Sequence, residues 1–124
     1  MESININEIS KFQSSKIVKK IPILSDQIMS TVFFIDTEMT TPGHQHAGFE
    51  EIHYIIKGSG KMFIDPESQE VHEGMLILVP KKKMHYFITN GDQLTVLAIN
   101  MVPHSRKGEK KVKNITGVKL KVKS

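Results

Sequence analysis

Short apolar segments recur along the chain and are separated by residues that favour turns. Residues 28–36 are rich in β-branched and aromatic side chains, residues 75–79 form a continuous apolar run, and residues 93–102 form the longest segment. The first composition favours strands, and a short continuous apolar run is typical of a strand buried on both faces. Many short strands with turns about every eight to twelve residues predict an all-β sandwich or barrel.

Glycine-rich turns predict two hairpins in the middle of the chain. Residues 50–57 alternate between apolar and polar side chains and lead into the Gly-Ser-Gly sequence at residues 58–60. This pattern predicts a tight turn to a returning strand at residues 61–64. The Asn-Gly-Asp sequence at residues 90–92 predicts a second hairpin turn, from a strand at residues 84–89 into the longest strand.

The two ends of the chain differ from its middle. Two isoleucines with near-helical spacing predict a short helix or an irregular arm within residues 1–15. Residues 16–103 contain the strands of the predicted β-barrel, starting with an edge strand whose pairing is restricted by Pro22. Residues 104–124 form a basic C-terminal tail. At 124 residues the chain is expected to hold a single domain.

Charge is distributed unevenly between the barrel and the tail. The formal net charge is +4, but residues 104–124 contain eight Lys or Arg and one acid, which leaves nine basic and twelve acidic residues elsewhere. Binding to nucleic acid is not indicated, because only the tail is basic and no aromatic residues interleave with its lysines. Val118, Leu120 and Val122 alternate with lysines, which predicts either a strand at a homodimer interface or a solvated tail.

Composition restricts the environment of the protein. The absence of cysteine excludes disulfides, thiolate ligands and a cysteine nucleophile. No apolar run reaches the roughly 18 residues of a membrane span, and the first residues do not have the pattern of a signal peptide. We therefore expect a cytoplasmic protein that binds neither membranes nor nucleic acid.

Candidate chemistry is concentrated in residues 44–53, which hold three histidines and two glutamates. His44 and His46 are two residues apart, so on an extended strand both imidazoles project from the same face. Two imidazoles and a carboxylate that converge on one point form a site for Zn, Fe, Mn, Ni or Cu. A fourth ligand must then come from elsewhere in the chain, and His85 is the candidate.

Two adjacent glutamates compete for the carboxylate position. An unbroken strand would place Glu50 beside the histidines, because its spacing from His46 is even. Glu51 is in phase only if residues 47–49 break the register, which the glycine among them readily allows. Strand parity alone leaves both glutamates open.

Two spaced motifs resemble those of the cupin superfamily. The first has the pattern His-x-His-x4-Glu-x6-Gly and runs from His44 to Gly58. The second has the pattern Gly-x5-Pro-x4-His-x4-Asn and runs from Gly74 to Asn90, after a spacer of 15 residues. The resemblance implies a double-stranded β-helix, or jelly-roll, barrel with a metal site near one open end. The side chains predicted to line this barrel are Phe33, Ile35, Met62, Ile64, Ile77, Phe87, Val96 and Ala98.

Three positions depart from the family pattern. The leading glycine of the first motif would fall at Glu38, Lys82 stands where the second motif has its glycine, and Asn90 comes one residue late. A lysine in a left-handed turn costs about 1–2 kcal/mol, so we expect this turn to be built differently. The position of His85 is unaffected by these departures.

The resemblance favours Glu51 over Glu50, because the first cupin motif has six residues between its glutamate and its final glycine. It implies a divalent transition-metal ion (Fe, Mn, Ni, Zn or Cu) with four protein ligands: His44, His46, Glu51 and His85. The metal affinity should fall as the histidines protonate below a pH of about 6.5. His53 shares the face of Glu51 and is expected to hydrogen-bond a ligand, to contact substrate or to be a core histidine. A barrel whose polar cluster binds no metal is the alternative.

The expected function is that of a small metal-binding cupin that acts on, or binds, an unidentified small molecule. This ligand pattern resembles that of dioxygenases, isomerases and decarboxylases of the superfamily, so the resemblance favours a metal-dependent enzyme. A non-catalytic cupin that binds or senses a small molecule, with or without metal, is the alternative. Small cupins are commonly dimers, so the resemblance also implies a homodimer.

Overall fold

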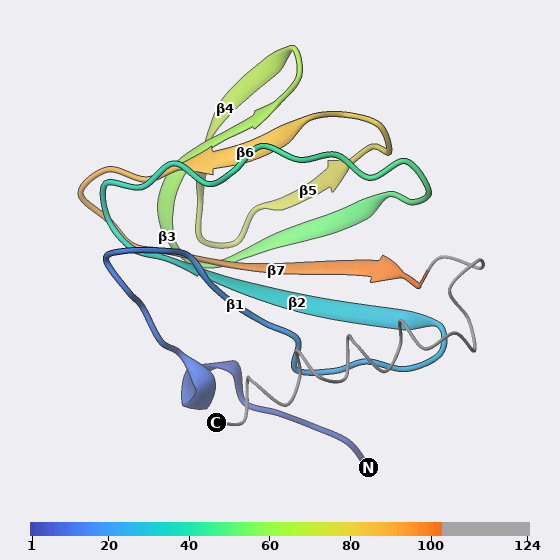
Figure 1. Ribbon diagram of the computed structural model, residues 1–124. Helices are drawn as coiled ribbons and strands as arrows, with labels where there is room; N and C mark the ends of the chain where they lie inside the picture. Colours follow the sequence, from blue (N-terminus) through green and yellow to red (C-terminus); the bar gives the residue numbers. More distant parts are fainter. Residues whose placement is uncertain (103–124) are drawn as a thin grey trace.

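The computed structural model describes residues 1–102, and Figure 1 shows their elements in order. One short 3-10 helix precedes seven strands: η1 (Ile6–Ile9), β1 (Val18–Lys20), β2 (Ile28–Ile35), β3 (Glu51–Ile64), β4 (Glu67–His72), β5 (Leu76–Val79), β6 (His85–Ile88) and β7 (Leu94–Met101). The all-β prediction is confirmed. The predicted strand or solvated tail at residues 104–124 lies outside the described residues.

The N-terminal arm starts with the predicted short helix. The Asn5 side chain caps η1 by accepting a hydrogen bond from the Asn7 N–H at 3.0 Å. The arm then packs on the outer side of β2, where the rings of Phe12 and Phe34 meet edge to face with centroids 5.6 Å apart. Within residues 1–102, no helix is long and apolar enough to cross a membrane.

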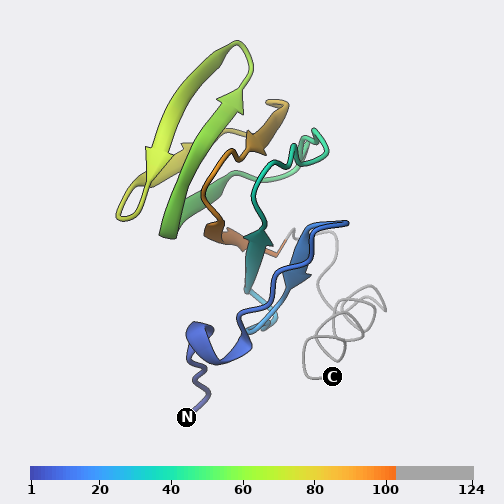
Figure 2. The ribbon, with the colours of Figure 1, turned by 90° about the vertical axis from the view of Figure 1, so that its left-hand side faces the viewer.

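Strand β3 belongs to both sheets and joins them. Its first part pairs with β5 and β7, and residues 59–64 pair with β4 and β6, always in antiparallel fashion. The first sheet continues from β7 to β2 and ends at β1, which is the predicted edge strand. Figure 1 shows β3 curving from the layer of β1, β2 and β7 to the layer of β4 and β6, and Figure 2 shows the arrangement from the side.

The hairpin predicted at residues 58–60 is wrong, because β3 runs through these glycines without reversing. Gly58 has a φ of +89°, and a Cβ at this position would overlap the backbone oxygen of Gln93. A Cβ at Gly60 would lie 2.8 Å from the backbone oxygen of Ile88. The glycines therefore serve a bend at which β3 packs closely against neighbouring backbone.

The hairpin predicted around residues 90–92 is also wrong. These residues connect β6 to β7, but the two strands do not pair with each other in the described sheets; each pairs with a different part of β3. The connection therefore crosses from one sheet to the other. Its turn residues reverse the chain direction but do not select the pairing partner.

The core lies between the two sheets. Its fully or nearly fully buried members are Ile35, Ile55, Met62, Val71, Val79, Phe87, Leu94 and Val96. Of the other residues predicted to line the barrel, Ala98 is fully buried and Phe33, Ile64 and Ile77 pack against the core cluster. The prediction that these side chains point into the barrel is therefore confirmed.

Strand β5 is not buried on both faces, which corrects the sequence prediction. Leu76 and Leu78 are 67% and 56% exposed, because no described element covers the outer side of β5. Five more large apolar side chains are at least 40% exposed on the outer side of β2, β3 and β7. We define the outer apolar face by all seven: Ile28, Ile52, Tyr54, Leu76, Leu78, Ile99 and Met101.

Both positions at which a family glycine is missing have left-handed backbone. The φ angles of Glu38 and Lys82 are +57° and +68°, and they are the only positive φ values of non-glycine residues in the described chain. The expectation that the turn at Lys82 avoids this conformation is therefore wrong. The Lys82 N–H donates to the His46 carbonyl at 2.7 Å, which ties the turn to the segment of the first motif.

Candidate metal centre

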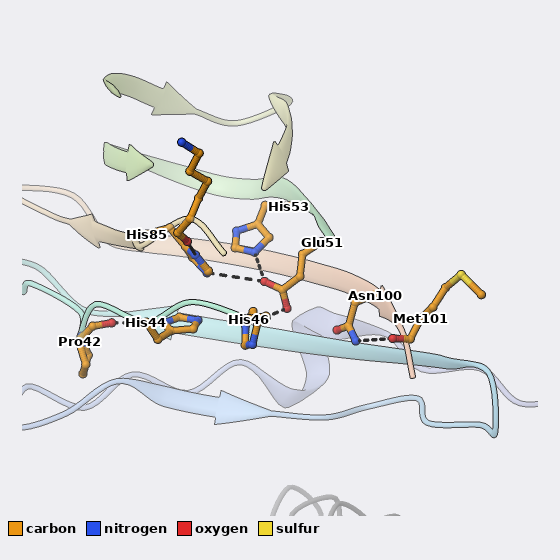
Figure 3. A network of polar contacts seen from close by, with 9 residues as sticks. Pro42, His44, His46, Glu51, His53, His85, Asn100 and Met101 are labelled. Atoms are coloured by element: carbon orange, nitrogen blue, oxygen red, sulfur yellow. Dashed lines mark hydrogen bonds and ion pairs between the residues drawn. The ribbon is translucent and has the colours of Figure 1, made fainter. Parts of the chain in front are cut away.

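Backbone hydrogen bonds bring the two histidine motifs together. The segment between β2 and β3 runs antiparallel beside β6, and His44 and His85 exchange backbone hydrogen bonds of 3.2 and 2.9 Å. Their imidazole centroids are consequently 4.1 Å apart. The ring of His46 lies 5.0 Å from that of His44. Figure 3 shows the three rings around one point. The two motifs that supply these rings lie about forty positions apart in the sequence.

Glu51, at the start of β3, is the glutamate that faces these rings. It is 7% exposed, whereas Glu50 is exposed to solvent. Bends at Ala47 and Gly48 break the strand register, as the choice of Glu51 required. The Glu51 carboxylate lies 3.6 Å from His46 Nε2 and 3.7 Å from His85 Nε2. One donor atom from each of the four predicted ligands lies within 4.8 Å of all the others.

Hydrogen bonds to backbone carbonyls orient two of the imidazoles. His85 Nδ1 donates to the Lys83 carbonyl at 3.1 Å, and His44 Nδ1 donates to the Pro42 carbonyl at 3.3 Å. A neutral imidazole that donates from Nδ1 carries its lone pair on Nε2. His85 Nε2 is buried and has no hydrogen-bond partner among the described residues. A buried lone pair that faces a carboxylate and two further imidazoles fits the chemistry of a metal ligand.

Burial adjusts the charges of this cluster. Burial lowers the pKa of His85 to about 4 and also lowers the pKa of His46, although the Glu51 charge opposes the shift at His46. Burial would raise the pKa of Glu51, but the hydrogen bond from His53 and the nearby imidazoles outweigh it, so the pKa of Glu51 is lowered. At neutral pH the imidazoles of His46 and His85 are uncharged and the Glu51 carboxylate is ionised. Metal ligation requires this protonation state.

His53 orients the carboxylate from inside the barrel. Its Nε2 donates to Glu51 Oε1 at 3.0 Å, and the side chain is 1% exposed. The ring stacks on Phe87 with centroids 5.8 Å apart and an interplanar angle of 17°. His53 thus combines two of its predicted roles: it hydrogen-bonds a proposed ligand, and it is a core histidine.

Both histidine motifs lie within a segment that matches a known family. Residues 32–102, more than half of the chain, match the family called Cupin domain. The chain belongs to the cupin family. This cupin is 38% identical over 63 residues to the uncharacterized protein MJ1618 of Methanocaldococcus jannaschii. The match covers half of this chain and half of that relative, so this cupin spans about half the length of its curated relative.

Solved structures establish the fold of this cupin. The structure of TT1209 from Thermus thermophilus has a TM-score of 0.76 at 16% identity, with 83% of this chain and 98% of that chain covered. A conserved protein with a double-stranded β-helix domain from Klebsiella pneumoniae also has a TM-score of 0.76, at 8% identity, with 84% and 92% covered. At these identities the likeness concerns the fold alone. The predicted double-stranded β-helix is confirmed.

A cavity of about 410 Å³ adjoins the cluster of this cupin. It extends from the imidazoles toward β1 and β2, and its lining residues are Ile17, Lys19, Met29, Thr31, Phe33, Ile35, Thr41, Pro42, His44, His46, Glu51, His53 and Phe87. Lys19 was not among the residues predicted from the sequence. It pairs with Phe33 across β1 and β2 and therefore shares the inner face, which can be deduced only once the strand register is known.

Proposed function

We propose that this cupin binds one divalent transition-metal ion, of Fe, Mn, Ni, Zn or Cu, through His44, His46, Glu51 and His85. The observation that carries the proposal is the unpartnered, buried Nε2 of His85, 3.7 Å from Glu51. A donor set of three imidazole nitrogens and one carboxylate suits these metals, whereas Mg²⁺ and Ca²⁺ prefer oxygen ligands. When bound, an ion of this class supplies Lewis acidity to a substrate oxygen.

We further propose that the protein is a metal-dependent enzyme for a small molecule that enters the adjoining cavity. The cavity volume of about 410 Å³ lies within the range of about 300–1,000 Å³ that is usual for small-ligand sites. In this arrangement His53 fixes the Glu51 carboxylate, and the neutral His46 and His85 present lone pairs without competing protons.

A non-catalytic binding or sensing function is the second candidate, and one observation favours it. Among the described lining residues, the titratable groups outside the proposed ligands are His53 and Lys19. His53 is engaged by Glu51, so Lys19 is the one remaining candidate for proton transfer. Product formation from a bound small molecule supports the enzyme, whereas saturable binding without product supports the sensor.

Elemental analysis of two neighbouring glutamate variants tests the metal site. The wild-type chain and Glu50→Gln, reconstituted at neutral pH and desalted, are expected to retain about one metal ion per chain. Glu51→Gln is expected to lose most of the metal, because it replaces the carboxylate that faces the three imidazoles with a neutral amide. The readout is the molar ratio of metal to protein by mass spectrometry. A wild-type chain without metal, or a Glu51→Gln variant that keeps it, would contradict the proposal.

A further inference from the structure

The cavity beside the cluster has a mostly apolar lining that includes Ile17, Met29 and Phe33, with the hydroxyl-bearing Thr31. Outside the cluster and His53, its titratable lining residue is Lys19. Lys19 is also the one lysine or arginine among the described lining residues. A cavity of this kind suits a ligand that has an apolar body and one charged group at a defined position.

Strand geometry holds Lys19 on the cavity side. Lys19 pairs with Phe33 across β1 and β2, and paired residues of antiparallel strands project from the same face. Its ammonium has no carboxylate within 4.0 Å among residues 1–102. The neighbouring Lys20 projects the other way, where its ammonium donates to the Ile9 carbonyl at 2.7 Å. Lys19 is therefore a cation at the cavity whose charge no described acidic side chain neutralises.

We propose that the cavity takes a small amphipathic carboxylate, whose carboxylate group pairs with the Lys19 ammonium and whose apolar body lies along Ile17, Met29 and Phe33. This inference rests on the proposed function, because the same cavity opens onto the metal cluster. A carboxylate fits better than a phosphate, because phosphate sites gather several cationic or backbone donors and this cavity offers one ammonium.

Calorimetric titration with hexanoate and with its neutral analogue hexanamide tests the carboxylate. Both probes are titrated into the metal-free and the metal-loaded full-length chain. We expect the wild type to bind hexanoate at least tenfold more tightly than hexanamide in both forms. Lys19→Gln should weaken hexanoate about tenfold and leave hexanamide unchanged, as expected for the loss of one charge-assisted hydrogen bond. Lys57→Gln is the matched control, because it removes the same charge outside this cavity.

The two forms separate this inference from the metal proposal. Lys19-dependent hexanoate binding in the metal-free chain supports the inference even if the chain retains no metal. Equal affinity for both probes, equal effects of Lys19→Gln and Lys57→Gln, or no binding of either probe would overturn it. A chain that binds metal but shows one of these results would keep its metal site and lose its carboxylate site.

Discussion

Replacing Gly58 with alanine is expected to lower the free energy of unfolding by about 3 kcal/mol or more. The φ of +89° at this position is unfavourable for any residue with a Cβ. The added methyl group would also meet the Gln93 backbone, which cannot move without disturbing the pairing of β3 with β7. Urea denaturation of the metal-free proteins, followed by circular dichroism, measures the difference.

Two comparison variants make this prediction specific to the bend in β3. Gly48→Ala should change the free energy of unfolding by less than about 0.5 kcal/mol, because a Cβ there meets no atom within 4 Å. Lys82→Gly should raise it by up to about 1 kcal/mol, because glycine relieves the left-handed conformation at φ +68°. Equal stabilities of Gly58→Ala and Gly48→Ala would refute the explanation of the bend.

Acidification of the metal-free protein from pH 6.5 to 4 is expected to lower its free energy of unfolding by roughly 2 kcal/mol. Burial lowers the pKa of His85 to about 4 in the folded chain, whereas an unfolded histidine titrates near 6.5. Between these values the unfolded state binds more protons, so stability falls as the pH falls. The contribution is fully present above pH 6.5. The lowered pKa of His46 acts in the same direction.

Denaturation curves of wild type and His85→Gln at several pH values test this dependence. The variant should show a shallower fall in the free energy of unfolding between pH 6.5 and 4, whatever its stability at neutral pH. An unchanged slope would show that His85 does not carry the effect. The same lowered pKa means that protons compete with a metal for the buried His85 only well below pH 6.5.

The segments in which the structure departs from the sequence prediction share one physical cause. Gly58 and Asn90 lie in local sequences that favour hairpin turns, and neither segment forms one. Glycine permits a bend, a close backbone approach or a turn, and the choice depends on strands that are distant in the sequence. The exposure of Leu76 and Leu78 has the same origin, since a run of apolar residues does not reveal whether a second layer covers the sheet.

The sequence by itself determined the all-β class, the two histidine motifs and the identity of the three imidazoles in the cluster. These follow from residue type and spacing, which are local properties. The structure decided that Glu51 rather than Glu50 joins the imidazoles, that His53 holds this carboxylate, and that Lys19 lies at the cavity. Each of these depends on strand register, and tertiary packing sets the register through contacts between residues far apart in the chain.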